Sequence, residues 1–206
     1  MPLLTTLLLI GLAFALGSAP FSVWLGYVFL RKDVRSYGDH NPGATNVFRA
    51  GNRLVGLLVL LLDISKAAAP IGVAYDLLGI RGPAMFLIAI APPLGHAFSP
   101  FLKFRGGKAL ATVLGVWIGL TNWPAAAASL IFVVLGYRLL AQPGWAVMLA
   151  MGGILGALLL WSPDPLLLGV LAAQWLLVIW THRADLHSLP RLRKRSDRSA
   201  SSAVKP

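Results

Sequence analysis

The sequence contains no cysteine and no glutamate, and only 12% of its 206 residues are charged. Without cysteine, the chain has no disulfide, no thiolate nucleophile and no zinc–thiolate site. A hydrophobic content of 57% and a mean hydropathy of +0.75 exclude an ordinary soluble domain of this length. The apolar runs are long and do not alternate with polar residues, so they predict membrane helices and not the strands of a lipid-facing barrel.

Acidic residues are scarce. Seven Asp stand against 18 Lys and Arg, which gives a formal net charge of +11. For a membrane chain this excess favours anionic lipid headgroups and phosphorylated substrates as partners. The basic run Arg191–Arg198 has the composition of a nucleic-acid patch, but beside a membrane span such a run more often contacts lipid. We therefore expect no nucleic-acid partner, and we expect residues 193–206 to form a basic, disordered cytoplasmic tail.

The apolar segments predict an all-α integral membrane protein, a compact bundle of about seven transmembrane helices in a single domain over residues 1–192. Uncharged sequence continues from the N-terminus to Leu30, which is too long for a signal-peptide core, so the first segment is expected to stay attached. Gly17, Ser18 and Pro20 predict a break within it, and the two small residues favour helix packing over a site role. If two segments form one broken element and another is re-entrant, the count falls to five. The expected spans are Leu3–Leu30, Leu54–Asp76, Pro83–Phe98, Ala109–Thr121, Ala125–Ala141, Trp145–Trp161 and Leu166–Thr181.

Charge asymmetry fixes the expected orientation. With seven spans, all Lys and Arg residues except Lys66 and Arg81 fall on one side of the membrane. The side rich in Lys and Arg is normally cytoplasmic. We therefore expect the N-terminus outside, the C-terminus inside, and three polar stretches (residues 38–49, 95–108 and 181–191) together at the cytoplasmic face.

Two of these stretches combine glycine with a cation. Asn41-Pro42-Gly43-Ala44-Thr45-Asn46 precedes Arg49, and Gly106-Gly107 precedes Lys108. Glycine lets the backbone approach a ligand closely, backbone N–H groups bind phosphate, and Arg and Lys neutralise its charge. The alternatives are an ordinary Asn-Pro-Gly turn and a basic loop that touches lipid. The second motif lacks the spacing of a nucleotide P-loop.

Ionisable residues near the membrane provide the other candidates. Asp63 and Lys66 are three residues apart in a predicted span, so they share a helix face. Such residues usually mark function, although a pair that only neutralises itself remains open. His96 and His182 each end a span, where acid–base chemistry or a structural role is possible. The few carboxylates nearby and the absence of a helical His pair argue against a metal site, and no cofactor is expected.

In order along the chain, the motifs NPGATNVFRAGN, DISK, GHAFSPFLKFRGGKALAT and HRADL resemble those of the bacterial acyl-phosphate:glycerol-3-phosphate acyltransferases of the PlsY type. The resemblance covers about residues 10–192. It implies an inner-membrane enzyme with its active site facing the cytoplasm. It also implies transfer of a fatty acyl group from acyl phosphate to the sn-1 hydroxyl of glycerol 3-phosphate, the first acylation step of phospholipid synthesis, which releases lysophosphatidic acid and phosphate. Membrane lipids are the remaining partners, and we expect a monomer.

The resemblance also suggests roles for residues. Arg49 and Lys108 would bind phosphate, and His182 would orient or deprotonate the glycerol hydroxyl. The expected catalytic residues are His182, Asp185 and Asn46, and the expected substrate-binding residues are Asp39, Asn41, Gly43, Thr45, Arg49, Lys66, His96, Arg105, Gly106, Gly107 and Lys108.

Three positions depart from the pattern of this family. Asp39 stands where the family usually has serine, Asp185 where it has asparagine, and Ala67 where it has glycine. A carboxylate near bound phosphate repels it unless a partner such as His40 or Arg183 neutralises the acid. Two alternative hypotheses therefore remain. One is a divergent paralogue that binds anionic lipid or phosphate with little or altered turnover, and the other is a small transporter.

Overall fold

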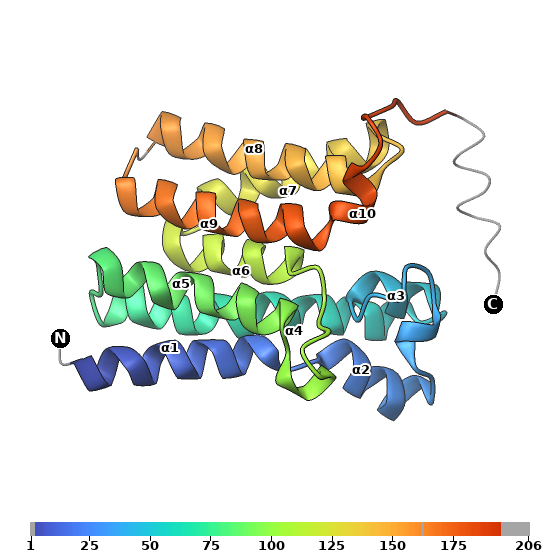
Figure 1. Ribbon diagram of the computed structural model, residues 1–206, viewed down its shortest axis with the longest axis horizontal. Coiled ribbons are helices and arrows are strands. Elements are labelled where there is room, and N and C mark those ends of the chain that lie inside the picture. Colours follow the sequence, from blue (N-terminus) through green and yellow to red (C-terminus); the bar gives the residue numbers. More distant parts are fainter. Residues whose placement is uncertain (1–2, 162, 195–206) are drawn as a thin grey trace. The chain divides into compact units, whose positions relative to one another are not determined.

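The computed structural model describes residues 3–161 and 163–194, whose regular elements are all helical, apart from an isolated bridge between Leu140 and Leu192 (Figure 1). The all-α class predicted from the sequence is confirmed for this part of the chain. The chain divides into two compact units, which we call the first unit (residues 1–120) and the second unit (residues 121–205). Most of the predicted basic tail lies outside the described residues.

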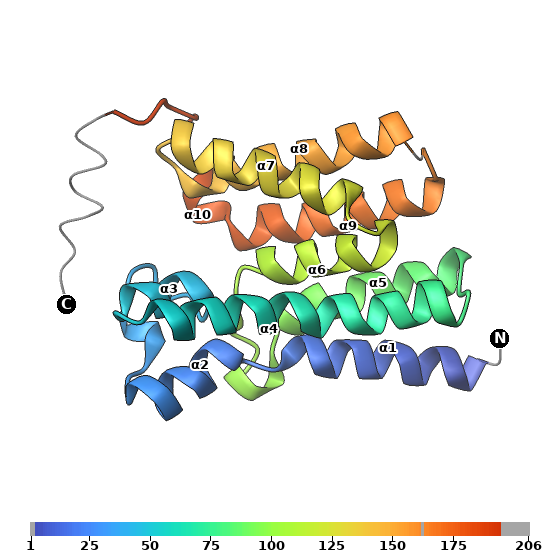
Figure 2. The ribbon, with the colours of Figure 1, turned by 180° about the vertical axis from the view of Figure 1, so that it is seen from behind.

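The first unit is built on three long helices, α1, α4 and α5, with α1 in contact with both of the others (Figures 1 and 2). Short helices and loops connect α1 to α4 at the end that carries the polar segments, and η3 leads from the other end of α4 to α5 (Figures 1 and 2). The helical elements are α1 (Leu3–Ser18), α2 (Phe21–Leu25), the π-helix η1 (Gly26–Leu30), the 3-10 turn η2 (Val34–Ser36), α3 (Ala44–Arg49), α4 (Arg53–Gly72), the π-helix η3 (Val73–Leu77), α5 (Gly82–Ala97), the 3-10 turn η4 (Pro100–Leu102) and α6 (Leu110–Thr121).

The predicted break in the first apolar segment is confirmed. Helix α1 ends at Ser18 and α2 begins at Phe21, with Pro20 directly before α2. A proline there fixes φ and removes a donor that the helix does not need. The hydroxyl of Ser99 donates a 2.6 Å hydrogen bond to the carbonyl of Ser18, which holds the end of α1 against the segment after α5.

Glycines allow α1 and α5 to pack closely. A Cβ atom on Gly17 would overlap the backbone of Pro92, and one on Gly95 would overlap the backbone of Phe14. Small residues at such crossings let helix backbones approach each other in a membrane protein. The packing role predicted for Gly17 is therefore confirmed, and α5 is held in register with α1.

The second unit contains α7 (Pro124–Leu139), α8 (Pro143–Trp161), α9 (Pro165–Thr181) and the short α10 (Arg183–Leu186). Gly136 lies against Ala146, so α7 and α8 approach closely. Asp164 caps α9 by accepting a 2.7 Å hydrogen bond from the backbone N–H of Leu166, and Pro165 occupies the first helical position. Helix α9 therefore begins at Pro165, one residue before the predicted start at Leu166.

All seven apolar segments expected from the sequence are helical, but their lengths differ. Four are long enough to cross a membrane by length and composition: Leu3–Leu30, Arg53–Leu77, Gly82–Leu102 and Pro143–Trp161. Three are shorter apolar helices: Leu110–Thr121, Pro124–Leu139 and Pro165–Thr181. The sequence already predicts that the segment ending at Thr121 is short for a span.

Candidate active site

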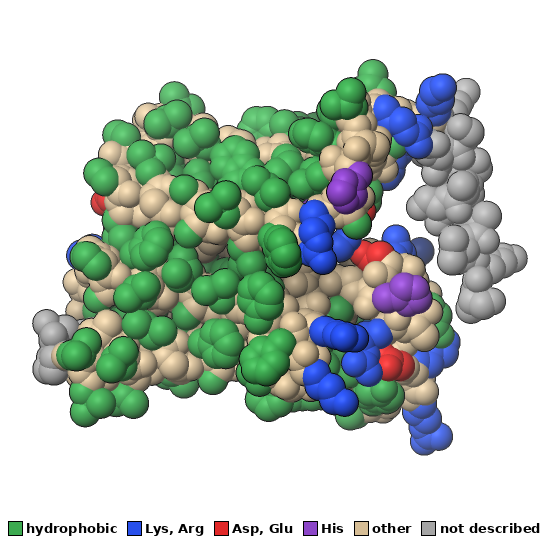
Figure 3. Space-filling view, viewed as in Figure 1, with side chains coloured by type: hydrophobic (Ala, Val, Ile, Leu, Met, Phe, Trp, Pro, Cys, Tyr) green, Lys and Arg blue, Asp and Glu red, His purple; other side chains and the backbone are tan. Residues whose placement is uncertain are grey.

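Two of the three polar stretches meet in the first unit. The ammonium of Lys108 lies 2.9 Å from Oδ2 of Asp39, although 69 residues separate them along the chain. The guanidinium of Arg49 lies 3.8 Å from Oδ1 of the same carboxylate. Lys and Arg side chains gather towards the end of this unit that carries α2 and α3, whereas hydrophobic side chains cover most of its remaining visible surface (Figure 3).

Asn46 organises this cluster from a buried position. Its amide nitrogen donates hydrogen bonds to Oδ1 of Asp39 (3.1 Å) and to the carbonyl of Asn41 (2.9 Å), and its amide oxygen accepts one from Arg49 (3.0 Å). The backbone N–H of Asn41 also points to Oδ1 of Asp39, at 3.4 Å. We call the four donor groups of Asn41, Asn46, Arg49 and Lys108 the anion cradle. In this structure all four face the carboxylate of Asp39.

The backbone around Asp39 is shaped for this contact. Gly38 has a left-handed φ of 57°, and His40 has a φ of 60°. A Cβ atom on Gly38 would overlap the guanidinium of Arg49 and the amide oxygen of Asn46. Glycine is therefore required at position 38 both for its conformation and for the space that it leaves. Gly38 was not among the predicted site residues, although it lies directly before Asp39.

The carboxyl of Asp39 remains charged at physiological pH. Partial burial raises its pKa, but the ion pair with Lys108 and the hydrogen bonds from Asn41 and Asn46 outweigh this effect, so the pKa lies below its usual value of 3.8. The stabilisation from these contacts is present above that value and is lost as the pH falls through the lowered pKa. The neutralising partner is Lys108, whereas His40 bonds to the carbonyl of Arg35 at 2.8 Å.

Gly106 and Gly107 position Lys108 against the end of α5. Their backbone N–H groups donate to the carbonyls of Ala97 (3.0 Å) and His96 (2.9 Å). A Cβ atom on Gly106 would overlap these carbonyls, and one on Gly107 would overlap the His96 ring. The sequence suggests that these glycines free the backbone to bind an anion. In the structure their N–H groups bind α5, and their role is to bring Lys108 close to the helix end.

Replacing Gly106 with alanine should lower the free energy of unfolding by about 1–3 kcal/mol, because the new methyl group meets rigid backbone atoms. The measurement is thermal unfolding of the purified protein in detergent. Gly11 is the matched control, since a Cβ atom there meets nothing within 4 Å. Equal melting temperatures for the Gly106→Ala and Gly11→Ala variants would contradict the contact.

A buried cluster of ionisable groups lies behind the Gly106-Gly107 segment. The ammonium of Lys66 lies 2.7 Å from Asp63, 2.9 Å from Nδ1 of His96 and 2.8 Å from the carbonyl of Ala19. The ammonium bonds to Ala19 and His96 and forms an ion pair with Asp63. Because Lys66 only donates, Nδ1 of His96 is the acceptor and its Nε2 carries the proton. Lys66 on α4 therefore links the segment after α1 to α5. Substrate contacts for Lys66 and His96 stay predictions.

Three further residues of the predicted site have simpler surroundings. Gly43 precedes α3 and donates its N–H to the carbonyl of Asn41 at 2.9 Å, which shapes the turn. Thr45 is exposed on the first turn of α3, and Arg105 is exposed in the loop before Gly106. Their roles in substrate binding stay predictions.

His182 and Asp185 lie in the second unit, at the junction of α9 and α10. His182 is buried, and its Nδ1 lies 3.0 Å from the carbonyl of Val178. A carbonyl only accepts, so Nδ1 of His182 donates to it. Asp185 packs its Cβ towards Gly144 at the start of α8. The roles of both residues in the site stay predictions.

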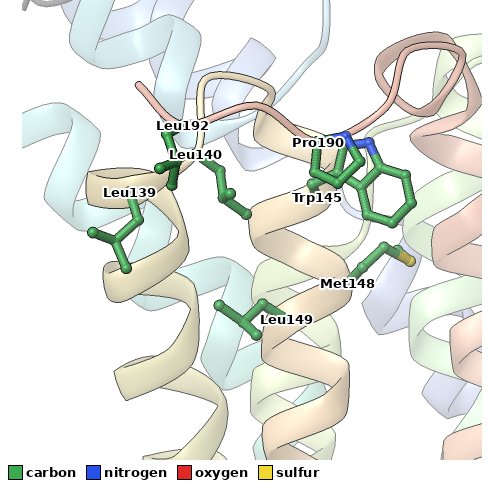
Figure 4. Close-up of a pocket in the computed structure, with 7 residues that line it drawn as sticks. All are labelled: Leu139, Leu140, Trp145, Met148, Leu149, Pro190 and Leu192. Atoms are coloured by element: carbon green, nitrogen blue, oxygen red, sulfur yellow. The ribbon is translucent and has the colours of Figure 1, made fainter. Parts of the chain in front are cut away.

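The second unit also contains an apolar pocket of about 430 Å³ between the end of α7, the start of α8 and the segment after α10 (Figure 4). The segment is held by backbone hydrogen bonds from Ala141 to Arg191 (3.0 Å) and from Arg193 to Leu139 (2.7 Å). Such a lining suits a hydrocarbon chain. The lining residues are Leu139, Leu140, Trp145, Met148, Leu149, Pro190 and Leu192.

The fold is that of a helical, strongly apolar protein in which two cations converge on one carboxylate. Residues 7–191 match the family model described as glycerol-3-phosphate acyltransferase, and the chain belongs to this family. A glycerol-3-phosphate acyltransferase of Aromatoleum aromaticum is 40% identical over 89% of this chain and 92% of its own. One of Desulfovibrio desulfuricans is 37% identical over 94% of this chain and 84% of its own.

A solved structure gives a similar result. The chain resembles the crystal structure of PlsY (YgiH), an integral membrane glycerol 3-phosphate acyltransferase, in its glycerol 3-phosphate form. The TM-score is 0.81 at 28% identity, covering 88% of this chain and 90% of that chain. The lysophosphatidic acid form of the same protein matches with a TM-score of 0.78. The chain is therefore a multi-pass membrane protein of the acyltransferase family.

Proposed function

We propose that this chain transfers a fatty acyl group from acyl phosphate to the sn-1 hydroxyl of glycerol 3-phosphate, releasing lysophosphatidic acid and phosphate. The observation that carries the proposal is the anion cradle, in which Arg49, Lys108 and two N–H donors converge on one negative charge. Both substrates carry phosphate. The family and the related proteins named above are described as glycerol-3-phosphate acyltransferases, which supports the acceptor and the acyl transfer. The acyl-phosphate donor and the sn-1 position are part of the proposal.

The reaction needs little covalent chemistry from the protein. Acyl phosphate is a mixed anhydride, so its phosphate leaves readily. The glycerol hydroxyl oxygen attacks the acyl carbonyl carbon, the bond from that carbon to the phosphate oxygen breaks, and the hydroxyl proton passes to a base. Arg49 and Lys108 would hold phosphate and neutralise its charge, and His182 would orient the hydroxyl or accept its proton. Positioning and charge neutralisation then supply most of the rate enhancement.

The proposal includes a location and a topology. Residues 1–192 would form one acyltransferase domain with seven spans in the bacterial inner membrane, the N-terminus outside and the cradle at the cytoplasmic face. The bias of Lys and Arg towards one side supports this orientation. Three of the seven apolar helices are short, so local thinning of the bilayer would have to accommodate them. The protein would act as a monomer.

The direct test is an acyl-transfer assay. Purified protein, incubated with palmitoyl phosphate and labelled glycerol 3-phosphate, is expected to form labelled lysophosphatidic acid without added cofactor. No labelled product across a range of pH would refute the proposal.

A second candidate is a divergent relative that binds phosphate with little turnover. The pairing of Asp39 with both cations of the cradle favours it, because a resident carboxylate competes with substrate. In that case the unmodified protein would be inactive, and the double variant Asp39→Ser, Asp185→Asn would gain activity. If both the unmodified protein and the double variant are inactive, both candidate functions are rejected.

A further inference from the structure

We propose that Asp39 is an internal competitor for the anion cradle, and that a phosphate dianion binds by displacing its carboxylate. This inference rests on the proposed function only in naming phosphate-bearing substrates as the displacing ligands. Its physical basis is the geometry of the contacts around Asp39 in this chain.

The carboxylate of Asp39 occupies the cradle as a bound anion would. Oδ2 lies 2.9 Å from Lys108, while Oδ1 accepts from the side chain of Asn46 at 3.1 Å and faces the N–H of Asn41 at 3.4 Å and Arg49 at 3.8 Å. Proteins bind phosphate oxygens through these same kinds of donor: an ammonium, a guanidinium, a side-chain amide and a backbone N–H. The same four groups would serve a phosphate in place of the carboxylate.

Asp39 reduces the charge available to a ligand. Its carboxylate pairs with both cations of the cradle and so offsets part of their positive charge. A phosphate dianion beside an ionised Asp39 would be repelled at short range. Binding therefore favours an arrangement in which the carboxylate has moved away.

Exchange is sterically open. The side chains of Asp39, Arg49 and Lys108 are 43%, 44% and 25% exposed, so solvent and small anions reach them. Asp39 sits between Gly38 and His40, both with left-handed φ values, in a loop outside the four long apolar helices. Asn46 is buried and bonded to Asn41 and Arg49, so these three cradle residues remain linked when the carboxylate leaves.

The experiment measures the affinity of the purified protein for inorganic phosphate and for glycerol 3-phosphate by isothermal titration, without an acyl donor. Asp39→Asn keeps the shape of the side chain, and Asp39→Ser removes most of it. Both variants are expected to bind phosphate about tenfold more tightly than the unmodified protein, because a competing charge has been removed. In the acyl-transfer assay, KM for glycerol 3-phosphate should fall in the same proportion.

Asp33→Asn is the matched control. Asp33 is another acid of the same loop, paired with Arg35 at 2.8 Å, and its removal should leave phosphate affinity unchanged. If Asp39 only holds Lys108 in place, both Asp39 variants bind phosphate more weakly or equally, and the inference is overturned. An equal gain in the Asp33 control would also overturn it, because the effect would then be one of general charge.

The outcome separates this inference from the proposed function. Tighter phosphate binding in both Asp39 variants supports internal competition even if no acyl transfer occurs. Acyl transfer by the unmodified protein, with unchanged or weaker phosphate binding in the variants, rejects internal competition alone.

Discussion

Replacing Lys108 with alanine should lower kcat/KM for glycerol 3-phosphate about 10- to 150-fold. A charge-assisted hydrogen bond to phosphate contributes about 1.5–3 kcal/mol, and this loss corresponds to that range of rates. Lys108 is the cation nearest to the anion already held in the cradle, at 2.9 Å from Asp39. Steady-state acyl transfer with varied glycerol 3-phosphate measures the effect.

Lys103 provides the matched control for this experiment. It is an exposed lysine in the same loop, five residues earlier, and Lys103→Ala removes the same charge. We expect this variant to retain activity within about twofold, because an exposed charge outside the site is largely screened. Equal losses in the two variants would mean that overall loop charge, and not the cradle, serves the reaction.

Replacing Lys66 with methionine should lower the free energy of unfolding by about 3–5 kcal/mol, because it leaves Asp63 buried without its partner. Both side chains of the pair are 3% exposed, and Lys66 also bonds to Ala19 and His96 inside the first unit. Thermal unfolding in detergent provides the measurement. If Lys66 instead serves substrate directly, KM would rise with little change in melting temperature.

A double variant sharpens the test of Lys66. Asp63→Asn combined with Lys66→Met removes both charges and should recover part of the lost stability, since no ionised group is left unpaired in the interior. A double variant no more stable than Lys66→Met would show that the charge pair is not the origin of the loss.

Much of the fold could be predicted from the sequence, because apolar segment length and breaker residues are local signals. Pro20 separates two helices where expected, and the segment expected at Ala125–Ala141 is observed as Pro124–Leu139. The π-helices at Gly26–Leu30 and Val73–Leu77 were not predicted. The hydrogen-bond pattern of a π-helix depends on how the helix end packs, and the spacing of apolar residues in the sequence does not predict it.

The site could be predicted in its residue types but only partly in its contacts. Glycine and cations at 38–49 and 106–108 indicated an anion site, and the structure brings these segments together. The pairing of Asp39 with Lys108 is a long-range contact that no local pattern contains. The amide partners of Gly106 and Gly107 were also missed, because they depend on how the loop returns to α5.

The most direct test of the proposed cytoplasmic phosphate site is labelling of a single cysteine at position 45, in place of Thr45. The chain has no cysteine of its own, so a Thr45→Cys variant carries one thiol, on an exposed position next to Asn46. A membrane-impermeant maleimide should modify it in inverted membrane vesicles but not in vesicles of the opposite orientation, and glycerol 3-phosphate should slow the reaction. Labelling from the outer face only, or an unchanged rate with saturating glycerol 3-phosphate, would contradict a cytoplasmic phosphate site built from this segment and Lys108.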